Sequence, residues 1–129
     1  MLQIFSDAGQ WQNITFAATL IFEDWSTQLA FFCKKYEDLE SCVVGEIMAI
    51  EQGRQWAVEN RPEGEECSIY ADTAIWMHMY SLCDHFKTVH VYHVPAHQLE
   101  HNPNKACDIL CSALLRPYKE AARGGVCMQ

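Results

Sequence analysis

Apolar side chains alternate with other residues along N-I-T-F-A-A-T-L-I-F, residues 13–22. A period of two is typical of a β-strand that buries one face. An apolar segment at residues 2–7 precedes it, and residues 27–36 are again rich in β-forming side chains. Because the links between these three segments are short, the sequence predicts three consecutive antiparallel strands.

The pattern becomes helical over residues 41–60, where apolar side chains recur at steps of three or four. The rest of the chain predicts further strands and helices in alternation: a strand at 67–71, a helix at 73–86, a strand at 89–94 and a helix at 105–115. Strands joined through helices in this way run parallel and connect by right-handed crossovers. The order βββαβαβα therefore predicts an α/β fold with a five-stranded mixed sheet and three flanking helices.

The chain contains no internal repeat and no linker rich in proline or glycine, so one domain is expected over residues 1–116. Pro117 would end the last helix, and residues 117–129, with Gly124 and Gly125, would form a flexible tail. The length of 129 residues is ordinary for one domain.

Composition excludes several classes of protein. The chain has 17 acidic and 9 basic residues, a formal charge of −8, which argues against binding nucleic acid by bulk electrostatics. No apolar run is long enough to span a membrane, and no secretory leader is expected. The seven cysteines are scattered without a C-x-x-C pair, so we expect buried thiols in a cytoplasmic protein and no structural zinc.

Four carboxylates stand in apolar contexts. The first predicted strand, residues 2–7, ends on Asp7, and the strand at 67–71 is followed directly by Asp72. Glu46 lies among apolar residues of the first predicted helix, and Asp108 lies inside the last one. Taken singly, each has an ordinary explanation: Asp72 could cap a helix, and Glu46 and Asp108 could lie on the surface of theirs. Together they would repel one another unless a cation lay among them, and hard oxygen ligands favour magnesium or manganese. The pattern predicts a divalent-metal site of the kind that two-metal phosphoryl-transfer enzymes use.

Four segments carry a resemblance to a known family: I-F-S-D at residues 4–7, G-E-I-M-A-I at 45–50, I-Y-A-D-T at 69–73 and V-P-A-H-Q-L-E-H-N-P-N-K-A-C-D at 94–108. They resemble the type 1 ribonuclease H family over nearly the whole chain, and the βββαβαβα order is also that of the family. The last segment, with its histidine, asparagine and aspartate on one loop and helix, is the most specific.

The resemblance implies hydrolysis of the RNA strand of an RNA–DNA hybrid by two Mg²⁺ ions, for which Mn²⁺ could substitute, with 5′-phosphate products. It assigns the metal to Asp7, Glu46, Asp72 and Asp108, and proton movement or product release to His97. The positions that correspond to substrate contacts in the family are Ala8, Gly9, Ser41 and Asn104.

The sequence departs from the family pattern where substrate would be held. The family's D-G-S is here Asp7-Ala8-Gly9, and its T-N-N is Ser41-Cys42-Val43. The segment between Asp72 and Asp108 is too short for the additional helix and basic loop of many cellular members. With few clustered basic residues, the chain is expected to bind hybrids weakly, with strong salt sensitivity and distributive action.

Two other functions stay open at this stage. The chain could be a ribonuclease H-like module that binds nucleic acid or a protein partner with little or no cleavage, or another nuclease of the superfamily, such as a junction resolvase. A homodimer or an accessory protein that supplies affinity is compatible with the sequence.

Overall fold

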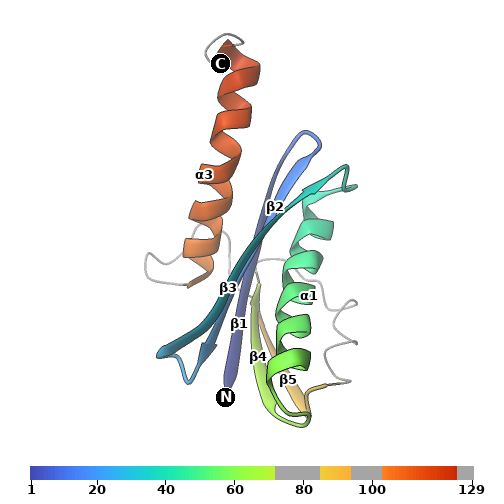
Figure 1. Ribbon diagram of the computed structural model, residues 1–129, viewed down its shortest axis with the longest axis vertical. Helices are drawn as coiled ribbons and strands as arrows, with labels where there is room; N and C mark the ends of the chain where they lie inside the picture. The colour runs from blue at the N-terminus through green and yellow to red at the C-terminus, as the bar shows by residue number, and fades with distance from the viewer. Residues whose placement is uncertain (72–84, 94–102, 125–129) are drawn as a thin grey trace.

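The computed structural model describes residues 1–71, 85–93 and 103–124. Five strands form one sheet in the order β3-β2-β1-β4-β5 (Figure 1). Their bounds are Leu2–Trp11 for β1, Ile14–Glu23 for β2, Thr27–Glu37 for β3, Glu66–Ala71 for β4 and Thr88–His93 for β5. The first three strands pair antiparallel, whereas β4 pairs parallel with both β1 and β5. The five-stranded mixed sheet predicted from the sequence is confirmed.

Strand β1 continues past the point at which the sequence suggested it would end. It pairs with β2 over its whole length, from Leu2↔Glu23 to Trp11↔Ile14. Its parallel pairing with β4, in contrast, ends at Phe5↔Tyr70. The prediction that the first strand ends on Asp7 was therefore wrong, because the hairpin with β2 keeps the backbone extended after the apolar run has ended.

The helices α1 (Cys42–Asn60) and α3 (Pro103–Gly124) lie on opposite sides of the sheet (Figure 1). On the α1 side, the core centres on aliphatic residues of the inner strands, among them Ile4, Ile21 and Ile69. On the α3 side, buried Phe5 and Leu20 pack with thiols and Leu115 of the helix. Because neighbouring residues of a strand point to opposite faces, β1 contributes to both cores at once.

Helix α1 approaches the sheet closely at Gly45. A Cβ atom at this position would lie 2.5 Å from Thr15 Cγ2 and 3.1 Å from Ala8 Cβ. The first of these distances is too short for two carbon atoms, so the packing of α1 on β1 and β2 requires glycine here. This close approach fixes the height of the first turns of α1 over the sheet.

The structure describes two of the three predicted helices. The helix predicted at residues 73–86 falls almost entirely within 72–84, which lies outside the described residues. The last helix does not end at Leu115 as predicted: it contains Pro117 and runs to Gly124. Residues 117–124 are thus helical, and the division of the chain at residue 116 into a domain and a tail stays a prediction.

The thiols within the described segments are all free, and Cys67, Cys107 and Cys111 are buried. This confirms the prediction that these cysteines pack as small apolar side chains. None of the helices described is long and apolar enough to cross a bilayer.

Candidate metal and nucleic-acid site

Asp7 lies inside β1, two residues beyond the last pair that β1 forms with β4. Its side chain is 7% exposed, and its Oδ1 accepts a hydrogen bond of 2.9 Å from the backbone N–H of Ala8. Alternation along the strand places Asp7 on the same face as Phe5, which is the face that α3 covers. A carboxylate at this depth is held in a fixed orientation on a rigid strand.

Glu46 occupies the second turn of α1 and is 6% exposed, so the sequence prediction that it lies on the buried side of its helix is confirmed. Its neighbour Gly45 is the residue that touches the sheet beside Ala8, the neighbour of Asp7. The segments that carry Asp7 and Glu46 are therefore closely packed, through Ala8 of β1 and Gly45 of α1. Burying two acidic side chains on touching segments is costly unless a cation or donors compensate them.

Asp108 lies in the second turn of α3 and is half-buried, with Lys105 Nζ 3.8 Å from its Oδ2. The pKa of the adjacent Cys107 is affected by its surroundings. Burial raises the pKa of the Cys107 thiol to about 12, and the negative charges of Asp7 and Asp108 both add to this rise. Asp7 faces α3, the helix that carries Asp108, so both carboxylates lie on the same side of the sheet.

Cysteines surround this region, which sequence reasoning described only as core. Cys33, Cys107 and Cys111 meet between β3 and α3, where Cys111 Sγ donates to the Phe16 carbonyl at 3.4 Å. Burial raises the pKa of Cys111 as well, with further contributions from Cys33 and Asp7. Cys107 and Cys111, four residues apart, lie on the same face of α3 and pack beside the strand that carries Asp7. The four-residue spacing was the signal, but its neighbour on the sheet could not be read from sequence.

Two of the five residues assigned to catalysis, Asp72 and His97, lie outside the described residues. Within residues 1–71, 85–93 and 103–124, no three histidine, cysteine or acidic side chains are grouped so that they could hold a metal ion. The donor chemistry of Asp7, Glu46 and Asp108 nevertheless suits a hard divalent cation, because all three offer carboxylate oxygens. Asp72 follows the last residue of β4 directly and is the carboxylate that the set would need.

The positions assigned to substrate contact have diverse surroundings. Ala8 is 9% exposed, and its carbonyl accepts a hydrogen bond from Cys42 Sγ at 3.3 Å. A Cβ atom on Gly9 would lie 3.0 Å from Cys111 Cβ, so this glycine permits α3 to approach β1. Ser41 is the N-cap residue of α1 and makes no side-chain capping hydrogen bond. The side chain of Asn104 lies outside the described residues, and substrate contact at all four positions stays a prediction.

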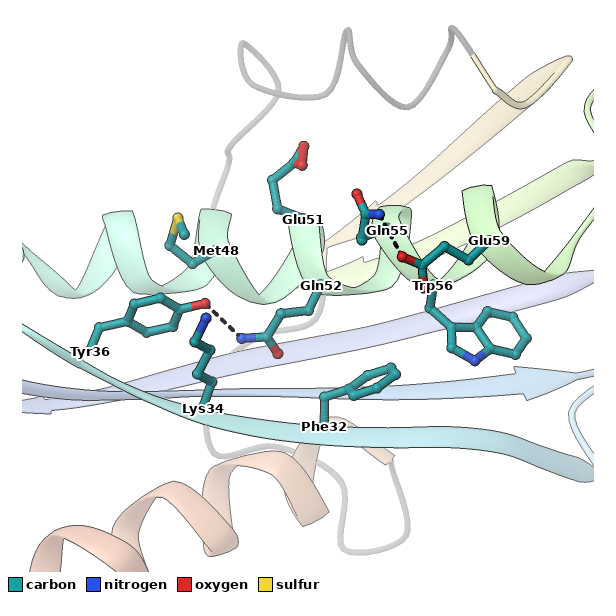
Figure 2. A pocket seen from close by; sticks show the side chains of 9 residues that line it. All are labelled: Phe32, Lys34, Tyr36, Met48, Glu51, Gln52, Gln55, Trp56 and Glu59. Atoms are coloured by element: carbon teal, nitrogen blue, oxygen red, sulfur yellow. Dashed lines mark hydrogen bonds between the residues drawn. The ribbon is translucent and has the colours of Figure 1, made fainter.

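A groove lies on the other face of the sheet, between β3 and α1 (Figure 2). It has a cavity volume of about 410 Å³ and is lined by aromatic, amide and charged side chains: Phe32, Lys34, Tyr36, Met48, Glu51, Gln52, Gln55, Trp56 and Glu59. Gln52 Nε2 donates to the Tyr36 hydroxyl at 3.1 Å, which ties the helix to the strand across the groove. The groove is separate from Asp7, which faces α3.

No family model matches the sequence, and no curated protein matches it. Solved structures are similar in fold. The N-terminal RNase H domain of Rv2228c from Mycobacterium tuberculosis, fused to maltose-binding protein, has a TM-score of 0.70 and 16% identity, over 87% of this chain and 96% of that chain. RNase H1 from the halophilic archaeon Halobacterium salinarum NRC-1 has a TM-score of 0.71 and 12% identity, over 90% and 98%. LC11-RNase H1 in complex with RNA/DNA hybrid has a TM-score of 0.63 and 11% identity, over 85% and 99%.

Proposed function

Since the chain has a ribonuclease H-like fold, we propose that it is a metal-dependent endoribonuclease that hydrolyses the RNA strand of RNA–DNA hybrids and leaves 5′-phosphate ends. The observation that carries the proposal is the pair of buried carboxylates, Asp7 and Glu46, on segments that pack closely through Ala8 and Gly45. Asp108 adds a third carboxylate on the side of the sheet that Asp7 faces. The LC11 enzyme, solved with RNA/DNA hybrid, has this fold and supports nucleic acid as the substrate class.

In this proposal Asp7, Glu46, Asp72 and Asp108 hold two Mg²⁺ ions, and Mn²⁺ can replace them. Bound magnesium lowers the pKa of a coordinated water and offsets charge on the reacting phosphate. The chain contributes fixed ligand orientation, which the hydrogen bond from the Ala8 N–H to Asp7 supplies. Asp7 and Glu46 are also 7% and 6% exposed, and the field of a buried carboxylate is stronger than in solvent.

His97 is proposed to accept or release a proton near the scissile phosphate, because an imidazole titrates close to neutral pH. Its loop lies outside the described residues, so the role rests on the resemblance of residues 94–108 to the family. The free thiols of the described segments agree with action in a reducing compartment, for which we propose the cytoplasm.

The deciding experiment is a cleavage assay on four labelled substrates: RNA–DNA hybrid, double-stranded RNA, single-stranded RNA and single-stranded DNA. Each is incubated with the chain in Mg²⁺, Mn²⁺ or EDTA. We expect the RNA strand of the hybrid alone to be cut, only with metal, and into products that carry 5′-phosphate. Asp7→Asn and Glu46→Gln should abolish cutting, because each removes one negative oxygen ligand while keeping side-chain size.

The matched control is Glu63→Gln, the same chemical change at an exposed position in the loop after α1. It should cut at the rate of the unmodified chain. Cleavage that survives in EDTA or in Asp7→Asn would show a contaminating nuclease. Metal-dependent cutting of branched DNA in preference to hybrid would instead support a junction resolvase.

A second candidate function is a ribonuclease H-like module that binds a protein partner and cuts little or nothing. The groove between β3 and α1 favours it, since aromatic Phe32 and Trp56 line an open cavity that lies apart from the carboxylates (Figure 2). If no substrate is cut with either metal, the groove becomes the first surface to test. Trp56→Ala should then weaken capture of a partner from extract, whereas Asp7→Asn should leave it unchanged.

A further inference from the structure

Three aromatic rings stack across neighbouring strands on the sheet face that α3 packs against. Phe5 of β1 stacks on Tyr70 of β4 with ring centroids 4.6 Å apart and planes 14° apart. Tyr70 stacks in turn on Tyr92 of β5, at 5.0 Å and 11°. The row begins in the core, where Phe5 is 1% exposed, and ends at the outer strand, where Tyr92 is 48% exposed. A planar group from outside could extend the row by stacking on Tyr92.

A fourth aromatic side chain, Trp25, meets the row at a steep angle. Its indole contacts Phe5 at 5.8 Å and Tyr70 at 5.1 Å, with interplanar angles of 67° and 66°. The indole is nevertheless 59% exposed. Most of this large apolar surface is in contact with solvent, so core burial does not explain its place here.

The backbone that presents Trp25 is strained. Asp24 and Trp25 both have left-handed φ angles, 49° and 64°, in the turn closed by the hydrogen bond from the Ser26 N–H to the Glu23 carbonyl. Such turns favour asparagine and glycine, because the Cβ of a bulky residue is crowded by the backbone in this conformation. Strain of this kind is often retained where a side chain serves a function.

Local contacts hold the strained turn in place. The Trp25 N–H donates to Gln3 Oε1 at 2.9 Å, and Asp24 Oδ1 accepts the N-terminal ammonium of Met1 at 2.6 Å. These contacts also neutralise the charge of Asp24, and Arg61 pairs with Glu23 at the end of β2. Asp24 and Glu23 beside Trp25 therefore have cationic partners, although the chain as a whole carries a charge of −8.

The row also adjoins the carboxylates described above. Phe5 and Asp7 are two residues apart on β1 and face the same side, so about 7 Å of strand separates them. The exposed end of the row is Tyr92 on β5, two strands away from β1, whereas Asp7 is 7% exposed, so a base stacked on Tyr92 would lie apart from that carboxylate.

We propose that the exposed rings of Tyr92 and Trp25, held in place by Tyr70 and the buried Phe5, form a stacking platform for the unpaired bases of a single-stranded nucleic-acid segment. Sheet faces that carry aromatic side chains bind single strands in this way, with about 1–3 kcal/mol from each stacked base and little sequence preference. Stacking needs no basic surface, so it gives an acidic chain a means of holding nucleic acid that phosphate contacts alone do not offer. This goes beyond the proposed nuclease function, because binding here requires neither metal nor cleavage.

The test is a titration of fluorescently labelled oligo(dT) with the full chain in EDTA, followed by anisotropy. Tyr92→Leu keeps apolar volume but removes the ring, and should weaken binding roughly 5- to 150-fold, the equivalent of one lost stacked base. Trp25→Gly should weaken binding similarly while it relieves the left-handed strain, so its urea midpoint should not fall. A side chain with a merely structural role would lower that midpoint.

Phe31→Leu is the matched control, since Phe31 is 43% exposed on β3, the opposite outer strand. Its affinity should equal that of the unmodified chain. Because the titration is done in EDTA, where the proposed nuclease has no metal, its result is independent of cleavage. Three results would overturn the platform: no binding of oligo(dT) by the unmodified chain, an equal loss in Phe31→Leu, or a dimer in light scattering that Tyr92→Leu dissociates. The last would identify the row as a surface between two copies.

Discussion

At the scale of single residues, Gly45 sets how closely α1 approaches the sheet. We expect Gly45→Ala to destabilise the fold by about 1–3 kcal/mol, because the new methyl group would overlap Thr15 Cγ2. The substitution improves helix propensity by up to about 1 kcal/mol, so a net loss requires the overlap to dominate. Urea unfolding followed by circular dichroism measures the difference.

The double variant Gly45→Ala/Thr15→Ser is the control for this overlap. Serine removes the methyl group that collides and keeps the hydroxyl that accepts a hydrogen bond from Gln10 Nε2. Part of the lost stability should therefore return. If the double variant loses as much stability as the two single variants together, the destabilisation by Gly45→Ala does not come from the overlap with Thr15 Cγ2.

Cys67 links stability to alkaline pH. Burial, helped by the charge of Glu65, raises its pKa from 9.0 to about 12. Above pH 9 the unfolded chain loses this proton while the folded chain keeps it, so the unfolded state binds fewer protons and the free energy of unfolding falls as pH rises to 12. This thiol can contribute a slope of up to about 1.4 kcal/mol per pH unit.

Cys67→Ser isolates this contribution, because serine does not ionise in this range. Whatever the free energy of unfolding of the variant at pH 8, it should decline less steeply between pH 9 and pH 12 than that of the unmodified chain. Urea midpoints at each pH measure both declines. Parallel declines in the two proteins would show that Cys67 ionises alike in both states.

At the scale of elements, α3 carries a proline inside the helix. Pro117 has no N–H to donate to the Ala113 carbonyl, yet the helix continues to Gly124. Packing compensates: Leu115 is 2% exposed, and Tyr118 contacts Phe16 with ring centroids 6.3 Å apart. Pro117→Ala should stabilise the fold, by up to about 3 kcal/mol, since it restores the hydrogen bond without disturbing these contacts.

Arg116→Ala, at the preceding exposed position, is the comparison for Pro117→Ala. It should change the unfolding midpoint little. If Pro117→Ala lowers stability instead, the proline ring itself makes a contact on which the helix depends.

At the scale of the whole molecule, the charge of −8 opposes compaction. Raising NaCl from about 0.01 M to about 0.15 M shortens the screening length from roughly 30 Å to 8 Å, so the thermal midpoint should rise. Calorimetry on Glu63→Gln/Glu120→Gln, which carries two fewer negative charges, should show a smaller rise. An equal rise in both proteins would indicate an ion effect unrelated to repulsion.

Local pattern accounts for much of this protein. The alternation at residues 13–22 and the helical repeat at 41–60 predict β2 and α1 closely. Each of these elements buries one face, and the apolar side chains of that face recur at a fixed spacing in the sequence. The burial of Glu46 and of the α3 thiols followed from the same periodicities. The sequence by itself therefore determined the kind and order of the elements described, and the bounds of β2 and α1 to within about a residue.

Other features depended on partners distant in the chain. β1 extends past Asp7 because β2 pairs with it, and α3 continues through Pro117 because Leu115 and Tyr118 pack against the sheet. The stacking of Tyr70 between Phe5 and Tyr92 depends on which strands are neighbours, and a strand's own periodicity does not specify its neighbours. Only the tertiary structure decided these features, since strand pairing and helix packing bring together residues that sequence spacing leaves far apart.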